Sequence, residues 1–460
     1  MKISPINQNV LVNTGSHTAL FIIETIPGGV VKQIKIKYGL DEHPPLLQTL
    51  IFGMQWLAIT VATVIIIGKV VAGLHYADFG QQLLYMQKLF FVIAISLFFQ
   101  VLWGHRLPLI TGPATVLLVA ILTGTGRGID AIYTSIAMGG AFLVLLSVTG
   151  LFSFISRYFT PRVVATILIL IALTITPTIL NLILTTTAAE TPLTNLGFAL
   201  LFFMAMITAD RLLPGIWKTT MIVWALIFGT MAYLVVVPAE VWHDRGHLGL
   251  VSGFFSNFTT GLILDPGLLI SFMICFIALS INDLGSIQAV GQIVNPPDMK
   301  RRVTHGITLS GLSNMLAGFF GVIGPVNFSM SVGIIAANGN ASRFSLIPTS
   351  LALMVMAFLP GVVAFIWNVP AVVIGTILLY IMCAQLAAGL MMAFGSKGFS
   401  FQDGLTIGIP MMISILVSYL PPEVKASFPP LLLPVIGNGF AMGVLAALIL
   451  EHIVYPVHET

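Results

Sequence analysis

Long apolar stretches, separated by Gly, Pro or charged residues, recur along the whole chain. A helix crosses a membrane core about 30 Å thick with roughly 20 mostly apolar residues, and most of these stretches approach that length. The pattern predicts an all-α integral membrane protein with about fourteen transmembrane segments. The expected segments lie at 46–68, 86–104, 107–123, 131–155, 161–184, 194–213, 216–237, 262–290, 305–323, 326–338, 344–367, 369–394, 403–420 and 430–452.

The composition excludes an ordinary soluble domain. Of 460 residues, 57% are hydrophobic and 8% are charged, and the mean hydropathy is +1.04, whereas a soluble domain carries roughly 25% charged residues. The polar ends are too short to bury a sizeable core. The apolar run 18–23 is too short for a secretory signal, so we expect a cytoplasmic N-terminus.

The distribution of Lys and Arg predicts the orientation, because cytoplasmic loops are enriched in both. With the N-terminus inside, most of the 19 basic residues fall on the cytoplasmic side. These are Lys2, Lys32, Lys35, Lys37, Arg106, Arg157, Arg162, Arg211, Lys218, Lys300, Arg301, Arg302, Arg343 and Lys397, against Lys69, Lys88, Arg127, Arg245 and Lys425 outside. We therefore expect a multi-pass protein of the cell (inner) membrane with both termini in the cytoplasm.

Two segments in matching places of the two halves are short and broken by Gly and Pro. They are 107–124, with Leu-Pro-Leu-Ile-Thr-Gly-Pro, and 324–338, with Gly-Pro-Val-Asn-Phe-Ser-Met-Ser-Val-Gly. Seven plus seven spans give halves of opposite orientation, and paired interrupted spans point to a transport site between inverted repeats. In the alternative, Pro113 and Pro325 merely kink or start continuous helices.

Three stretches resemble one transporter family. Tyr38-Gly-Leu-Asp-Glu-His-Pro-Pro-Leu-Leu precedes the first span, Gln55-Trp56 stands where many members have Gln-His, and Arg302 to Gly321 is similar to the ninth span. The chain thus resembles the nucleobase–ascorbate transporters (nucleobase:cation symporter-2), which include uracil, xanthine and uric acid permeases. This resemblance implies two inverted seven-helix repeats, with spans 3 and 10 each a short strand plus a half-helix.

The resemblance also implies a core domain and a gate domain that move against each other, and a homodimer. On this reading the chain divides into a cytoplasmic N-terminal segment (1–45), the first half of the core (46–156), the first half of the gate (157–240), an extracytoplasmic loop (241–261), the second half of the core (262–367), the second half of the gate (368–452) and a C-terminal tail (453–460).

The eighth span carries the most distinctive candidate residues. Gly285 places Asn282 where the family usually has a glutamate, and Ser286 lies four residues further on. Asp283 is the one carboxylate well inside an apolar span, where a charge costs roughly 2.5–3.5 kcal/mol and usually marks function. Asp283 either couples transport to a proton or hydrogen-bonds the broken backbone of span 3 or 10, and either Asn282 or Asp283 could bind the cargo.

In the tenth span the family signature aligns with Met330-Ser331-Val332-Gly333, of which only the glycine is kept. The resemblance implies that Phe328 stacks on a planar ring and that Ser329 meets the edge of that ring. Met330 offers a weak sulfur acceptor and apolar contact, so we expect a less polar pocket than is usual. Thr115 on span 3 and Gln55 on span 1 complete the predicted substrate site.

The expected function is secondary active transport of a nucleobase such as a purine, xanthine or uracil, or a similar flat heterocycle, by proton symport with elevator-like alternating access. The alternatives are a transporter of the same fold, or an uncoupled facilitator, for another small solute or anion, and a membrane enzyme. We found no nucleotide-binding glycine loop, zinc-ligand spacing or nucleophile with His, so no enzyme activity, cofactor or metal is expected. The net charge of +3 is too small to indicate nucleic acid.

Overall fold

A computed structural model describes residues 10–14, 17–22, 34–186, 191–237, 261–328, 330–394, 400–421 and 432–455, with short stretches between 249 and 259 and between 423 and 429. Most of the predicted loop 241–261 therefore lies outside the described residues. So do Lys2, Lys32, Arg245, Ser329, Lys397 and Lys425.

The described chain is mainly helical. The N-terminal segment forms a small antiparallel sheet of β1 (Val10–Thr14), β2 (His17–Ile22) and β3 (Ile34–Lys35). The first half then contains α1 (Leu46–His75), α2 (Phe79–Leu102), β4 (Thr111–Pro113), α3 (Thr115–Gly124), η1 (Thr125–Arg127), α4 (Ile129–Val148), α5 (Leu151–Ser156), α6 (Pro161–Leu184), α7 (Pro192–Leu212), α8 (Gly215–Thr219) and α9 (Met221–Val236).

The second half repeats this order of long helices around a broken segment. It contains α10 (Pro266–Val294), α11 (Met299–Phe320), β5 (Pro325–Asn327), α12 (Ser331–Asn338), η2 (Arg343–Leu346), α13 (Ile347–Ala357), α14 (Pro360–Trp367), α15 (Ala371–Phe394), α16 (Phe401–Ser418), α18 (Leu433–Ile436), α19 (Gly439–Ile449) and η3 (Leu450–Val454).

Eight helices of the described chain are long and apolar enough to cross a membrane, namely α1, α2, α4, α6, α7, α10, α15 and α16. Each overlaps one of the predicted segments. Four shorter apolar helices lie at Thr115–Arg127, Met221–Val236, Arg343–Ala357 and Gly439–Val454. The chain is thus a multi-pass membrane protein, and many large apolar side chains on its outer surface, such as Leu201 and Met391, are exposed as contact with lipid requires.

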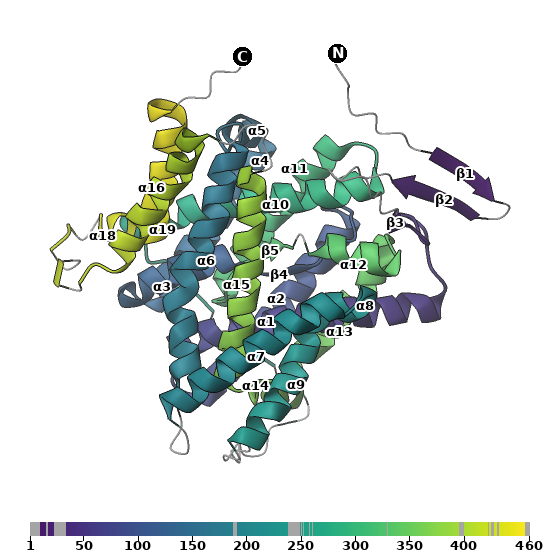
Figure 1. Cartoon of the computed structure of the whole chain (residues 1–460), viewed down its shortest axis with the longest axis horizontal. Helices are drawn as coiled ribbons and strands as arrows, with labels where there is room; N and C mark the ends of the chain where they lie inside the picture. Colours follow the sequence, from purple (N-terminus) through teal and green to yellow (C-terminus); the bar gives the residue numbers. More distant parts are fainter. Residues whose placement is uncertain are drawn as a thin grey trace.

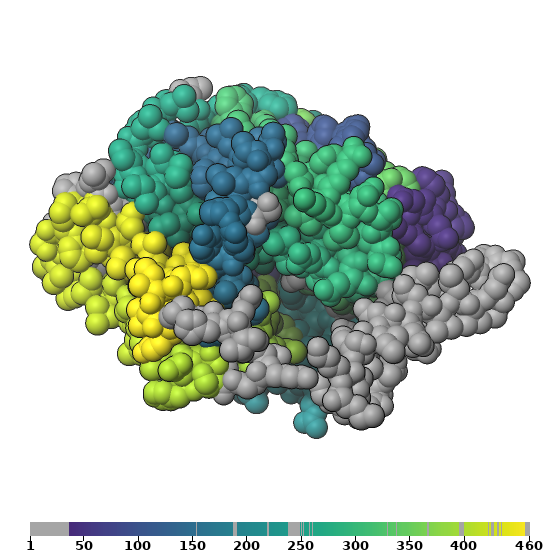
Figure 2. All heavy atoms as spheres, turned by 90° about the horizontal axis from the view of Figure 1, so that it is seen from above, coloured from purple at the N-terminus to yellow at the C-terminus, as the bar shows by residue number. Residues whose placement is uncertain are grey.

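Helices from the two halves pack against each other in pairs. α4 packs against α11, α2 against α13, and α6 against α15. The α4–α11 pair is especially close, because a Cβ added at Gly140 would lie 2.6 Å from the Gly311 carbonyl oxygen. Small residues allow such close approach inside a membrane. Figure 2 shows one face on which blue residues of the first half lie beside green residues of the second.

The two broken segments meet in the middle of the bundle (Figure 1). β4 and β5 pair antiparallel, with Thr111 opposite Asn327 and Pro113 opposite Pro325. All residues of both strands are buried. Each strand leads into a half-helix, α3 or α12, as predicted, because a strand pair satisfies the unwound backbone where no water is available.

The predicted loops gather at two ends of the molecule. At one end, the Arg302 guanidinium donates to the carbonyls of His105 and Arg106 at 3.2 and 2.9 Å, and Arg343 pairs with Asp41 at 2.7 Å. At the other end, the α1–α2 turn, the start of α4 and the start of the loop after α11 surround one pocket. Which end faces the cytoplasm stays a prediction.

One predicted boundary is wrong in a way that matters. α2 begins at Phe79, with the Asp78 carboxylate capping the N–H of Gln81 at 2.9 Å, rather than at 86. Polar residues such as Gln81 on the first turns of α2 had masked the beginning of the helix. Lys88 consequently lies in the third turn of α2 and is buried, not near the end of a span.

Candidate functional site

Buried polar groups join β5 to α10. The Asp283 Oδ1 accepts the backbone N–H of Asn327 at 2.8 Å, and the Ser286 hydroxyl donates to the Asn327 carbonyl at 3.0 Å. Asp283 and Ser286 lie three residues apart on α10 and share one face. That face of α10 therefore holds the last residue of β5 by both backbone groups.

The side chain of Asn327 joins the two strands. Its Oδ1 accepts the Thr111 hydroxyl at 3.0 Å, and its Nδ2 lies 3.4 Å from the Ser310 hydroxyl on α11. Asn314 of α11 donates to the Pro325 carbonyl at 2.9 Å. Buried polar groups need such partners, so this network fixes the strand pair in the bundle.

The two carboxylate oxygens of Asp283 differ in their surroundings. Its Oδ1 supports the broken backbone, as that alternative requires. Its Oδ2 is buried and has no hydrogen-bond partner among the described residues. One oxygen is thus occupied by the fold, and the other is available to a proton. A coupling role stays a prediction.

Asn282 and Gly285 lie on a different face of α10. Asn282 is half-buried, Gly285 is exposed, and a Cβ at Gly285 would meet no atom within 4 Å. Within the described chain the Asn282 amide makes no hydrogen bond. It can therefore offer a donor and an acceptor to a ligand in the adjoining open space. Ser286, four residues after Asn282, donates its hydroxyl to the Asn327 carbonyl of β5, and a role in binding the cargo stays a prediction.

Phe328 follows β5 directly and lies over β4. A Cβ built on Gly112 would be 2.3 Å from the Phe328 Cε2, so the ring rests against a position that only glycine leaves free. The Phe328 N–H bonds the Ile110 carbonyl at 2.9 Å. The ring is half-buried, which leaves part of it accessible for stacking.

Neither half-helix has a side chain capping its N-terminus. α3 begins at Thr115 after Ala114, and α12 begins after the half-buried Met330. The first N–H groups of such helices have no intrahelical acceptor and carry partial positive charge. Thr115 is half-buried, and its hydroxyl bonds nothing in the described part of the chain. The start of α3 can donate hydrogen bonds to a carbonyl or an anion, whereas at α12 the Ser331 N–H already donates to the Phe328 carbonyl at 3.3 Å.

The structure places Gln55 away from the other predicted site residues. Its side-chain oxygen lies 3.3 Å from the Nδ2 of Asn338, at the far end of α12 from the strand junction. The α1 residue beside the junction is Thr63, whose hydroxyl oxygen lies 3.1 Å from a Cβ built on Gly112. Thr63 is eight positions further along α1, or about 12 Å, and nothing in the sequence around it sets it apart.

Known proteins support the class that this geometry indicates. A sequence model of the Permease family (Xan_ur_permease) matches residues 47–423. The chain is 23% identical to the xanthine permease of Bacillus subtilis over 89% of this chain and 94% of the relative. It is 24% identical to the uric acid permease PucK of the same organism over 90% and 96%.

Solved structures show the same fold. The transmembrane domain of the cyanobacterial bicarbonate transporter BicA aligns with a TM-score of 0.59, at 15% identity, over 83% of this chain and 98% of that domain. Identity this low shows the fold alone.

Proposed function

The chain belongs to the Permease family of membrane transporters, and on this premise we propose that it carries an oxopurine or a similar flat nucleobase across the cell membrane by proton symport. Membership makes it a transporter rather than an enzyme, in agreement with the prediction from sequence. The names of its relatives, xanthine permease and uric acid permease, support the cargo class.

One observation supports the position of the cargo. α10 holds β5 with Asp283 and Ser286 on one face, and leaves the Asn282 amide beside the open space at Gly285. In the proposed complex, Asn282 pairs with the amide-like edge of the ring, Phe328 stacks on its face, and the first N–H groups of α3 and α12 meet its carbonyl oxygens. Met330 supplies an apolar wall.

The proposed motion is a displacement of a core domain (46–156 and 262–367) against a gate domain (157–240 and 368–452), with spans of opposite orientation in the two halves. The packing of the helices supports this division. α2 contacts α13 as α4 contacts α11, and β4 contacts α1 as β5 contacts α10, the relations that an inverted repeat produces. A homodimer and cytoplasmic termini belong to the same proposal.

A carrier of small anions is the second candidate. Two uncapped half-helix N-termini suit an anion, and Asn282 and Met330 bring no negative charge to the site. The buried Asp283 carboxylate, next to the same strand, disfavours it.

A thermal-stability panel on the purified protein separates the two candidates, because a ligand that binds the folded state raises its Tm. Xanthine, uric acid, uracil and ascorbate are compared with bicarbonate and chloride. We expect stabilisation by one or more nucleobases, reduced in Phe328→Ala, and none by the anions. Stabilisation by bicarbonate alone would replace the proposed cargo by an anion.

A further inference from the structure

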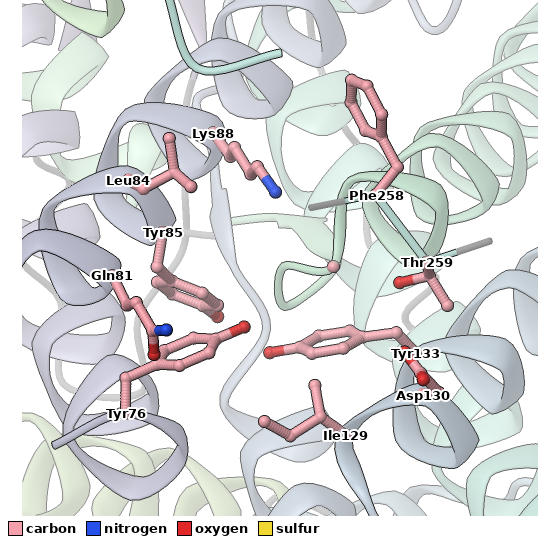
Figure 3. A pocket seen from close by; sticks show the side chains of 11 residues that line it. Tyr76, Gln81, Leu84, Tyr85, Lys88, Ile129, Asp130, Tyr133, Phe258 and Thr259 are labelled. Atoms are coloured by element: carbon pink, nitrogen blue, oxygen red, sulfur yellow. The ribbon is translucent and has the colours of Figure 1, made fainter. Parts of the chain in front are cut away.

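A cavity of about 400 Å³ lies at the other end of the molecule from the clustered arginines. The α1–α2 turn, α2, the first turns of α4 and the Phe258–Thr259 segment surround it (Figure 3). We call it the tyrosine pocket, after Tyr76, Tyr85 and Tyr133. It shares no lining residue with the site around Asn282 and Phe328.

Two of the phenol rings are held in place by the fold. The Tyr85 hydroxyl oxygen accepts the Ile323 N–H at 3.0 Å, and the Tyr133 hydroxyl lies 2.8 Å from the His75 Nδ1. Both rings are buried. The hydroxyl ends of Tyr76 and Tyr133 point toward each other across the pocket (Figure 3). The pocket is therefore preformed, with aromatic walls and polar edges.

Lys88 places a positive charge in the pocket. It lies within a membrane-spanning helix and is buried, and its ammonium points into the cavity (Figure 3). The nitrogen is 5.4 Å from the centre of the Phe258 ring, a distance at which a cation is attracted to the ring face. Cations inside membrane spans are costly and generally mark a functional site.

The chemistry of the pocket changes from its floor to its mouth. Lys88, Thr259, Tyr85 and Tyr133 are buried, whereas Gln81 and Asp130 are exposed at its rim. The floor thus presents an ammonium and hydroxyl groups, the walls present rings, and the rim presents an amide and a carboxylate. A flat ring with carbonyl oxygens on one edge and N–H groups on another matches all three.

We propose that the tyrosine pocket is a second binding site for an oxopurine. The carbonyl or oxyanion edge of the ligand faces Lys88 and Thr259, its ring packs beside Tyr76 and Tyr133, and an N–H group faces Asp130 at the rim. This proposal rests on the proposed function, because it assigns the same class of ligand to a separate place. A volume of about 400 Å³ is within the usual range for small-molecule sites.

Equilibrium binding of radiolabelled uric acid to the purified full-length protein tests the proposal. Uric acid combines several carbonyl groups with acidic N–H groups. We expect two bound molecules per chain in the wild type and one in Lys88→Met. Phe328→Ala should lose the other molecule, and the double variant both. Lys69→Met is the matched control, because it removes a lysine from α1 that bonds the Val369 carbonyl away from the pocket, and it should keep both.

Thr259→Val guards against a folding failure of Lys88→Met, since it removes one hydroxyl and no charge. It should weaken binding of uric acid at the tyrosine pocket by about tenfold, the loss expected for one hydrogen bond. A single bound molecule in the wild type that is lost in Phe328→Ala and kept in Lys88→Met would overturn the second site and leave the proposed function standing. No binding of any nucleobase to the wild type would overturn both.

Discussion

The carboxylate of Asp283 accepts the backbone N–H of Asn327 across 2.8 Å. The one carboxylate well inside the eighth span therefore holds β5 in place. The same residue is the candidate for proton coupling through its second oxygen. These two roles can be separated because asparagine keeps an oxygen acceptor but cannot carry the proton.

Asp283→Asn should fold with a Tm close to that of the wild type and should exchange substrate, yet fail to accumulate it. A proton entering with the substrate draws about 2.3 kcal/mol per 100 mV from the membrane potential, and the variant loses this drive. The measurement is uptake into liposomes with acid outside, with and without a protonophore. Asp283→Ala, which also removes the acceptor, should be destabilised by about 1–3 kcal/mol. Proton-driven accumulation by Asp283→Asn would leave Asp283 with a structural role only.

Gly112→Ala should weaken substrate binding without preventing insertion, because the added methyl group would meet the Phe328 ring at 2.3 Å and displace it. We expect a loss of about tenfold or more, the usual range for an aromatic contact and the burial it provides. In a binding titration, Gly112→Ala combined with Phe328→Ala should bind no more weakly than Phe328→Ala alone. Additive losses would show that Gly112 acts independently of the ring.

Asn282→Ala should reduce affinity and leave stability nearly unchanged, because the amide bonds nothing within the described residues. The expected loss is about 1–3 kcal/mol, or roughly five- to 150-fold in Kd, if a polar edge of the ligand loses its partner. Asn314→Ala is the matched control. Its amide bonds the carbonyls of Ser310 and Pro325 at 2.7 and 2.9 Å, so it should lower Tm. A fall in Tm for Asn282→Ala at unchanged Kd would remove Asn282 from the site.

Arg301→Cys and Gln81→Cys, each in a background without Cys275 and Cys383, should be labelled from opposite sides by an impermeant thiol reagent. Both positions are exposed, and they belong to the two ends at which the loops gather. With the reagent added outside, labelling of Arg301→Cys only after the membrane is permeabilised would agree with the predicted orientation. Labelling of both from one side contradicts it.

His105 should make the folded state less stable in acid. It lies between α2 and β4, accepts the Leu107 N–H on Nδ1 at 3.0 Å, and burial lowers its pKa to about 3. An unfolded histidine has a pKa near 6.5. The unfolded state therefore binds the extra proton, so the stability is complete above about pH 6.5 and falls as the pH drops toward 3. His105→Asn should flatten this slope by up to about 1.4 kcal/mol per pH unit. An unchanged slope would show that the imidazole is accessible to protons in the folded state.

The sequence was sufficient for the features that depend on backbone chemistry. Pro113 and Pro325, each preceded by a glycine, marked two broken segments in matching places, and the family resemblance implied the strands and half-helices that the structure has there. Asp283 could be singled out because it is the one carboxylate well inside an apolar span. Neither inference depends on which helix face a side chain occupies.

The direction in which each side chain faces could not be predicted from the sequence and is known only from the structure. Asn282 and Asp283 are adjacent in sequence, but about 100° of helix rotation separates them, and only the position of β5 decides which one meets the strand. Gln55 fits a family pattern but contacts Asn338 instead of the strand junction. Lys88 was overlooked because the polar residues at the start of α2 read as a loop, although a lysine within an apolar run is a signal that could have revealed it.

The two-faced helix α10 has a consequence for how this protein can change over evolutionary time. Point substitutions at positions 282 and 285 can alter which cargo is accepted, since the bonds from Asp283 and Ser286 to Asn327 are untouched. Inserting or deleting one residue between Asn282 and Ser286 would rotate the rest of the helix by about 100° and take Ser286 off the strand. We expect the length of α10 to be invariant in lineages where its open face has diversified.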